Sequence, residues 1–199
     1  MIGRISSRKL VVSAVLVVGG VALLAPRPVR VFAQRATTAP AAREQAAPVA
    51  QALKQSWDGA RKNIKASGDL MPEPNFPFKP VDTVRSFGEI LAHVAGANYE
   101  FCSAAKGVKT PHAEDAFEKS ATTRAAILKA LDDSLVYCDA IYAEQTDKSL
   151  AEAITLPFGM GAGTRAAALM GNVGHLNEHY GNLVTYMRIK GIVPPSSRR

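Results

Sequence analysis

The chain has few of the residue types that would direct it toward several common functions. Its 199 residues include two cysteines, four histidines and one tryptophan. No dense Lys/Arg stripe with interleaved aromatic residues occurs, which argues against nucleic-acid binding. No stretch of useful length alternates apolar and polar residues, so long β-strands are not expected. These absences favour a helical protein without a nucleic-acid partner.

The longest apolar run lies near the N-terminus, where basic residues precede residues 10–25. As a helix, this sixteen-residue run would span about 24 Å, less than the roughly 30 Å of a bilayer's hydrocarbon core. Residues 31–33 supply small side chains for a cleavage site before Gln34. We therefore predict a secretory signal over 1–33, an exported protein in the periplasm or outside the cell, and no stable membrane span after cleavage. Two arginines between the run and the cleavage site are atypical and leave an uncleaved anchor as the alternative.

This N-terminal segment also carries most of the positive charge. The chain has 24 Lys and Arg against 17 Asp and Glu, a net charge of +7. Five of the basic residues and none of the acidic ones lie within 1–33, so cleavage leaves 19 basic and 17 acidic residues, a net charge of +2. The basicity therefore belongs to the export segment and does not indicate a nucleic-acid surface.

The remainder of the chain has the pattern of one helical domain. Residues 34–47, rich in Ala, Thr and Pro, are typical of a disordered tether. Apolar spacing and cap residues predict four long helices, over about 48–66, 83–105, 120–144 and 164–190. Four such helices in about 150 residues predict an all-α four-helix bundle over 48–195, followed by a short basic tail, 196–199, that we expect to be disordered.

Local signals place the helix ends and the buried sides. We expect Gly68 to end the first helix, Thr83 to cap the second, and Val49 and Ala125 to face inward. The glycine-rich residues 159–163 read as a flexible lead into the last helix, because they lack the preceding strand and the Lys-Ser/Thr end of a phosphate-binding loop. Near the start of that helix, Arg165 could meet an anionic group.

The two cysteines bear on the topology, because exported proteins reach an oxidising compartment where Cys102 and Cys138 can form a disulfide. In a simple antiparallel hairpin of the second and third helices they would lie about 27 Å apart, far beyond the roughly 7 Å that a disulfide allows between Cα atoms. In parallel helices they lie level, and residues 106–119 can span about 46 Å, enough to return along a helix of about 35 Å. We therefore predict parallel second and third helices joined by this disulfide; two separate buried thiols are the alternative.

Two histidines four residues apart, His175 and His179, lie in the predicted last helix. A four-residue step places both imidazoles on one helix face, where they can bind the same divalent transition metal. Zinc and nickel are the expected metals, because imidazole is a suitable ligand for both. A third ligand is needed, and His93, in an apolar helical stretch near the edge of its buried stripe, is the better candidate. His112 lies in a polar connection and is expected to be a solvated surface residue. The alternative is a chance pair, with His93 as a hydrogen-bonded core residue.

Two stretches, residues 85–93 and residues 175–188, together with the trailing 191–195, resemble the DinB-like (YfiT-like) family of metal-binding four-helix bundles. The resemblance covers about residues 49–195. It implies an up-down-down-up order with the second and third helices parallel, a fold that often forms homodimers, and a three-histidine metal site with open positions.

The histidines of this implied site are His93, His175 and His179. Members of the family with known activity are thiol-dependent, among them bacillithiol-using transferases and a mycothiol-dependent maleylpyruvate isomerase. Such thiols are cytoplasmic, so the predicted export signal puts the reaction in doubt more than the metal site.

The pattern His175-x-x-Glu178-His179 also fits inverted zinc peptidases, but that class takes a downstream Glu as its third ligand. None of the twenty residues after His179 is acidic. Glu178 is then an exposed residue or one that supports a ligand, and Asn182 and Tyr186 share the histidine face and could line a pocket.

Three protein ligands leave a metal position open, whereas a structural zinc takes four. We therefore expect a metal-dependent enzyme, hydrolase or thiol-transferase-like, acting on an unknown small molecule. A non-catalytic bundle that binds a metal or a small ligand is the alternative.

Overall fold

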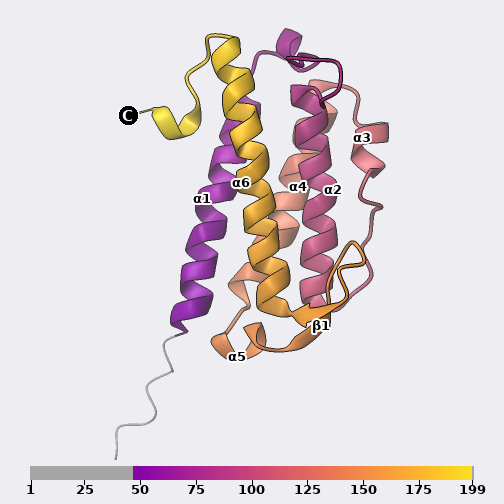
Figure 1. Ribbon diagram of the computed structural model, residues 1–199, viewed down its shortest axis with the longest axis vertical. Coiled ribbons are helices and arrows are strands. Elements are labelled where there is room, and N and C mark those ends of the chain that lie inside the picture. The colour runs from indigo at the N-terminus through magenta and orange to yellow at the C-terminus, as the bar shows by residue number, and fades with distance from the viewer. Residues whose placement is uncertain (1–46, 199) are drawn as a thin grey trace, which may run out of the picture. The chain divides into compact units, whose positions relative to one another are not determined.

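The computed structural model describes residues 47–198, so the predicted signal and nearly all of the predicted tether lie outside the described residues. The described residues are mostly helical (Figure 1). Among them, no helix combines the length and the apolar character that a membrane span needs. The long helices are α1 (Pro48–Leu70), α2 (Phe87–Lys106), α4 (Arg124–Ala143) and α6 (Arg165–Ile189), and the short elements are η1 (Glu73–Asn75), α3 (Ala116–Ser120), α5 (Asp147–Leu150), β1 (Ala153–Thr155), β2 (Ala162–Thr164) and η2 (Pro195–Ser197).

The second long helix, α2, lies at the centre of the packing. It contacts α4, α6 and the short α3, while α1 packs against α4 and α6 (Figure 1). Sixteen of its twenty residues are buried, because helices or loops cover it on nearly every side. The core around it is apolar, and its largest fully buried side chains include Trp57, Phe87, Leu131 and Leu176.

Three helix ends differ from those that the sequence predicts, and one of them is the start of α4, which begins at Arg124 after the Thr123 cap rather than near residue 120. The second helix begins after Ser86 rather than Thr83, because Ser86 and Glu89 form a capping box in which the Glu89 amide donates to Ser86 Oγ and the Ser86 amide donates to Glu89 Oε2. The first helix continues past Gly68 to Leu70. A Cβ at Gly68 would lie 2.6 Å from a Leu128 methyl group, so this glycine allows close packing against α4 and does not end the helix.

Contacts join α2 to α4 along much of their length. A disulfide links Cys102 to Cys138, with 5.6 Å between their Cα atoms, in place of two separate thiols. One helical turn earlier in each helix, Asn98 Nδ2 donates to Ser134 Oγ over 3.0 Å. The helices are thus tied covalently and by a buried hydrogen bond at the end that lies near the β-strands.

The glycine-rich residues 159–163 do not form a flexible lead into α6. They close a two-stranded antiparallel hairpin in which Ala153 pairs with Thr164 and Thr155 with Ala162. Phe158, with φ of 56°, is the one non-glycine residue with positive φ among the described residues, and it lies in this turn. Strands of three residues are too short to produce a recognisable alternation of apolar and polar side chains, which is why the sequence did not reveal them.

Three smaller expectations were also wrong. Val49 is 58% exposed and Ala125 is exposed, since each lies beside the buried side of its helix rather than on it. The C-terminal tail is ordered as far as it is described, because the Tyr180 hydroxyl accepts from the Ser196 amide over 2.9 Å and donates to Ser196 Oγ over 2.7 Å.

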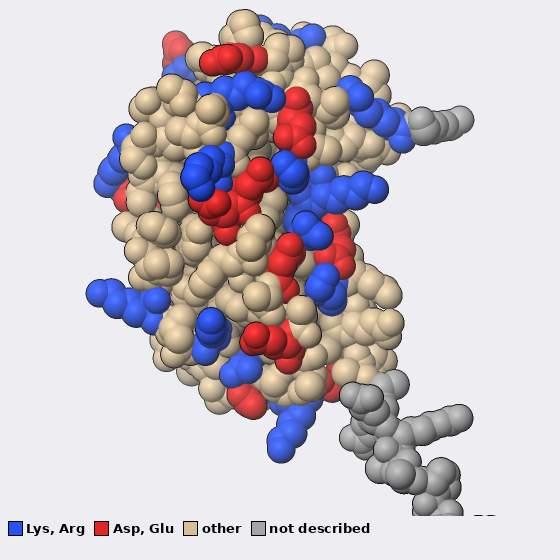
Figure 2. Space-filling view, turned by 180° about the vertical axis from the view of Figure 1, so that it is seen from behind, with Lys and Arg blue, Asp and Glu red and all other residues tan. Residues whose placement is uncertain are grey.

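Acidic and basic side chains alternate on the face formed by α1 and α4. Figure 2, which views the molecule from behind, shows blue and red groups interspersed over this face, without a large area of one sign. Ion pairs between neighbouring residues explain the pattern, with Lys54–Asp58 at 2.7 Å and Lys65–Asp132 at 2.9 Å. Exposed pairs of this kind contribute little to stability, on the order of 0–1 kcal/mol each.

Candidate metal centre

Three histidines from two helices converge on one point. His93 Nε2 on α2 and His179 Nε2 on α6 each lie 3.1 Å from Nε2 of His175, also on α6. The potential ligand atoms of all three lie within 4.8 Å of one another. Three nitrogens bound tetrahedrally at about 2.0–2.1 Å from a metal would be about 3.3–3.4 Å apart, so the observed spacing fits one ion with little movement. His112 is not part of this cluster.

The packing of α6 against α2 positions these side chains. Thr164 caps α6, since its Oγ1 accepts from the Ala167 amide. Leu176 and Leu183, both fully buried, fix the side of α6 that faces the core. His179 lies on the same side, 8% exposed, and His175 lies one turn earlier at the edge. The helical four-residue spacing therefore delivers both imidazoles to the groove beside α2.

The electrostatic setting keeps the α6 histidines neutral. Burial, followed by the neighbouring His179 and His93, lowers the pKa of His175 from 6.5 to about 3. Burial and His93 lower the pKa of His179 to about 4. Neutral imidazole is the form that binds metals, so both rings are ready to act as ligands at neutral pH. In addition, Nδ1 of His175 is buried without a hydrogen-bond partner, although buried polar atoms are nearly always satisfied.

Two residues at the centre were not found from the sequence. Glu118, on α3, places Oε1 3.0 Å from Nδ1 of His93. Arg85, just before α2, pairs with the same carboxylate, with 2.8 Å between Arg85 Nε and Glu118 Oε2. No periodicity could have revealed Glu118, because α3 has five residues and was not expected. Arg85 lies within the stretch that resembles the family, but nothing in its spacing suggested an ionic partner.

A polar cleft opens beside His179. Its volume is about 720 Å³. The sequence-predicted residues Glu178, Asn182 and Tyr186 all line it, together with Arg85 and Glu118. The Tyr186 hydroxyl donates to the Arg85 carbonyl over 2.9 Å, and burial raises the pKa of this hydroxyl.

The cleft thus combines a potential metal ligand with polar groups that can orient a small molecule. Arg165 lies elsewhere, where it pairs with Glu152 at 2.7 Å near the hairpin.

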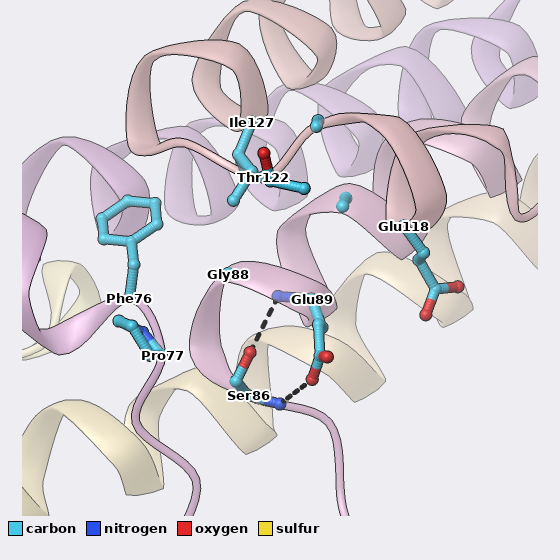
Figure 3. A pocket seen from close by; sticks show the side chains of 10 residues that line it. Phe76, Pro77, Ser86, Gly88, Glu89, Glu118, Thr122 and Ile127 are labelled. Carbon is cyan, nitrogen blue, oxygen red and sulfur yellow. Dashed lines mark hydrogen bonds between the residues drawn. The ribbon is translucent and has the colours of Figure 1, made fainter.

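A second cavity of about 230 Å³ lies beside the start of α2 (Figure 3). Phe76, Pro77 and Ile127 form one side of it, and the capping box of Ser86 and Glu89 closes another. Glu118 lines both this cavity and the cleft. The second cavity contains no histidine, so the candidate metal centre belongs to the cleft.

The helical fold agrees with what comparison with known proteins finds. The model of the DinB superfamily matches residues 52–183, and the chain belongs to this superfamily. No curated protein matches the sequence.

Solved structures share the fold. A DinB-like protein from Bacillus cereus ATCC 10987 is 20% identical, with a TM-score of 0.58, over 73% of this chain and 95% of that one. A DinB-like protein from Bacillus subtilis is 20% identical, with a TM-score of 0.57, over 74% and 99%. The mycothiol-dependent maleylpyruvate isomerase is 14% identical, with a TM-score of 0.56, over 67% of this chain and 60% of that one.

Proposed function

We propose that this protein is an exported metal-binding helical bundle that acts as a metal-dependent enzyme, hydrolase or thiol-transferase-like, on a small molecule. The observation that carries the proposal is the convergence of three imidazole Nε2 atoms beside a polar cleft. Among residues 47–198, the cluster comprises His93, His175 and His179 and no further His, Cys, Asp or Glu. Structural zinc sites take four protein ligands, whereas catalytic sites take three and keep a position open.

The three histidines and two residues of the adjacent cleft have roles in this proposal. The three histidines hold a divalent transition metal, zinc or nickel, because imidazole suits both. Such a metal supplies Lewis-acid chemistry, since it lowers the pKa of a water molecule or thiol bound to it toward neutrality. Asn182 and Tyr186 line the cleft on the same helix and orient the small molecule.

The choice between the two reaction classes depends on the cosubstrate. The structural similarity to a mycothiol-dependent isomerase supports a thiol as the metal's partner. The predicted export separates the protein from cytoplasmic thiols, which favours hydrolysis by water. A small thiol is therefore the informative probe. Its binding tests whether the metal has an open position and whether that position accepts a thiol as well as water.

Cobalt provides the test, since its visible absorption reports the number and type of ligands. We expect the purified chain to bind one cobalt ion, and its spectrum to gain a sulfur-to-metal band when a small thiol such as 2-mercaptoethanol is added. The matched variant H175A should lose the cobalt spectrum. A cobalt-bound spectrum that no thiol, azide or other small ligand changes would contradict an open site and favour the non-catalytic metal-binding alternative.

We also propose the up-down-down-up order of α1, α2, α4 and α6, with α2 and α4 parallel. The contacts between these two helices support it, because residue numbers rise together along both. A Cβ at Gly88 would lie 3.0 Å from Ile127, and Cys102 is bonded to Cys138. In antiparallel helices, contacts near the start of one would fall near the end of the other.

The compartment and the partners complete the proposal. The disulfide suits an oxidising compartment, so we propose that the protein is periplasmic or extracellular, with an uncleaved N-terminal anchor as the alternative. The mass of the exported protein distinguishes a cleaved signal from an uncleaved anchor, since cleavage predicts a chain that begins at Gln34. We also propose that the protein has no nucleic-acid partner, and the interspersed charges on the face of Figure 2 support this. The resemblance to the family also implies a homodimer, and sedimentation measures whether the chain forms one.

A further inference from the structure

The carboxylate of Glu118 joins two partners at the edge of the histidine cluster. Its Oε1 lies 3.0 Å from Nδ1 of His93, and Arg85 reaches both oxygens, Nε to Oε2 at 2.8 Å and Nη2 to Oε1 at 3.3 Å. The side chain is only 20% exposed. A carboxylate accepts hydrogen bonds and cannot donate them, so the contact requires a proton on Nδ1 of His93. In that tautomer the lone pair is on Nε2, the atom that faces His175.

Glu118 reaches His93 because the connection between α2 and α4 lies directly on α2. We call residues 107–120 the arm. At Gly96 a Cβ would lie 1.8 Å from the carbonyl oxygen of Glu114 and 2.8 Å from its carbonyl carbon, so a side chain there would collide with the arm's backbone. Gly96 is three residues beyond His93 and therefore lies on the same side of α2, one turn further along.

Aromatic contacts hold the arm beyond this point. Tyr99, three residues after Gly96, contacts the rings of His112 and Phe117 with centroids 4.8 and 5.8 Å away. His112 and Phe117 also contact each other at 4.9 Å. His112, expected to be a solvated bystander, is thus an exposed residue that helps to fasten the arm.

From these contacts we infer that the arm is a functional element and that Glu118 is a positioning residue, which holds His93 with Nε2 free to bind the metal. The inference rests on the proposed metal-binding function and adds to it the residue that selects the ligand atom. Carboxylates that accept from a metal-binding histidine typically raise metal affinity about 10–100-fold. Gly96 acts indirectly. Because it has no side chain, the arm can lie close to α2, which brings Glu118 to His93.

Zinc affinity, measured by competition with a chromophoric chelator, tests the role of Glu118. We expect E118A to bind zinc about 10–100-fold more weakly than the native chain. E118Q keeps an oxygen that accepts from Nδ1 and should lose less than E118A. A native chain and E118A with equal zinc affinity would overturn the inference while leaving the metal site in place.

Nitrogen-15 NMR of the imidazole rings gives a second readout that needs no metal. In the metal-free native chain, we expect His93 to carry its proton on Nδ1, and in E118A to shift toward the tautomer protonated on Nε2. A purely structural role for Glu118 would leave the tautomer unchanged. If the native chain bound no zinc, the proposed function would fail, but this measurement would still decide the role of Glu118: a proton on Nε2 in the native chain would overturn it.

Gly96 supplies an independent variant with a matched control. G96A should displace the arm and lower zinc affinity as E118A does, without removing any polar group. The control G59A lies in α1, where an added Cβ has no atom within 4 Å, and should bind zinc like the native chain. Native-like affinity in a folded G96A would contradict the role of the arm's close approach, and if G96A does not fold, the two Glu118 variants decide.

Discussion

The histidines of α6 are buried in a state that makes the metal-free protein sensitive to acid. Their pKa values in the folded protein are about 3 and about 4, below the ordinary 6.5. When the pH falls below about 6.5, the unfolded chain takes up protons at these positions and the folded chain does not. Stability is therefore fully present above pH 6.5 and is lost as the pH falls toward the folded pKa values.

We predict that the metal-free protein loses up to about 2.7 kcal/mol of unfolding free energy per pH unit between about pH 6 and 4, because two protons are taken up on unfolding. Urea unfolding with a chelator present, at pH 7, 6 and 5, measures the loss. The double variant H175Q/H179Q has no such groups and should show a flatter pH dependence. If the unfolding free energies of the two proteins changed with pH in parallel, these histidines would have ordinary pKa values in the folded protein, which would contradict the prediction.

How far the sequence predicts individual residues depends on whether local spacing determines their place. His175 and His179 follow from a four-residue step on one helix, and His93 from an apolar helical stretch. Glu118 could not be predicted, since its contact with His93 depends on an arm whose path is set by Gly96. The same limit explains Val49 and Ala125, where a shift of about 100° around the helix moves a side chain out of the core.

At the scale of elements, the disulfide between α2 and α4 is the strongest tie. It links residues 36 apart in the sequence. The chain-entropy model gives about 4 kcal/mol for a loop of that length. We predict that reduction lowers the unfolding free energy by about 3–4 kcal/mol while far-UV circular dichroism keeps its helical form.

Urea unfolding of the native chain with and without reductant is the cleanest measurement, because it changes no side chain. The variant C102A/C138A should lose more than reduction does, since it also removes two buried sulfur atoms that lie 3.6 and 3.7 Å from Asn172 Nδ2. Equal stability with and without reductant would contradict the role given to the disulfide.

The long helices were predictable and the short elements were not. The periodicity of apolar residues is repeated over five or more turns in α1, α2, α4 and α6, so a one-residue error changes little. The hairpin, α3 and α5 comprise three to five residues per element and are held by contacts from elsewhere in the chain. The sequence also does not show whether a glycine ends a helix or allows close packing. Gly107 ends α2, with φ of 76°, whereas Gly68 lies within α1 and allows it to pack closely on α4.

At the scale of the whole molecule, the apolar core extends well beyond the metal centre. Buried side chains from all four long helices form the core, whereas the histidines lie at the groove beside the cleft. We therefore predict that chelation lowers the melting temperature without unfolding the protein. At a free zinc concentration of 100 times Kd, bound metal contributes about 2.7 kcal/mol, or roughly 5–10 °C for a domain of this size.

Calorimetry with zinc and with chelator measures this shift, and H175A should show none. Loss of helical circular dichroism on chelation would contradict the account, because it would mean that the metal is part of the fold. Retained helicity with a lower melting temperature distinguishes a functional site on a stable bundle from a structural one.

The helical fold of the described residues was predicted from apolar spacing and the family from residues 85–93, 175–188 and 191–195, and the family match confirms the membership. The cleft was only partly foreseen. Asn182 and Tyr186 follow from the spacing on α6, whereas Glu178 lies outside the histidine face, and the opposite wall comes from the loop before α2 and from α3. Walls assembled from different parts of the chain depend on tertiary packing, which periodicity does not report.

The metal content of the purified chain, measured by elemental analysis beside H175A, tests the three-histidine metal site most directly. We predict about one transition-metal ion per chain in the native protein and a loss of that ion in the variant, with helical circular dichroism unchanged. No metal in the native chain, even after incubation with zinc or nickel, would contradict the account.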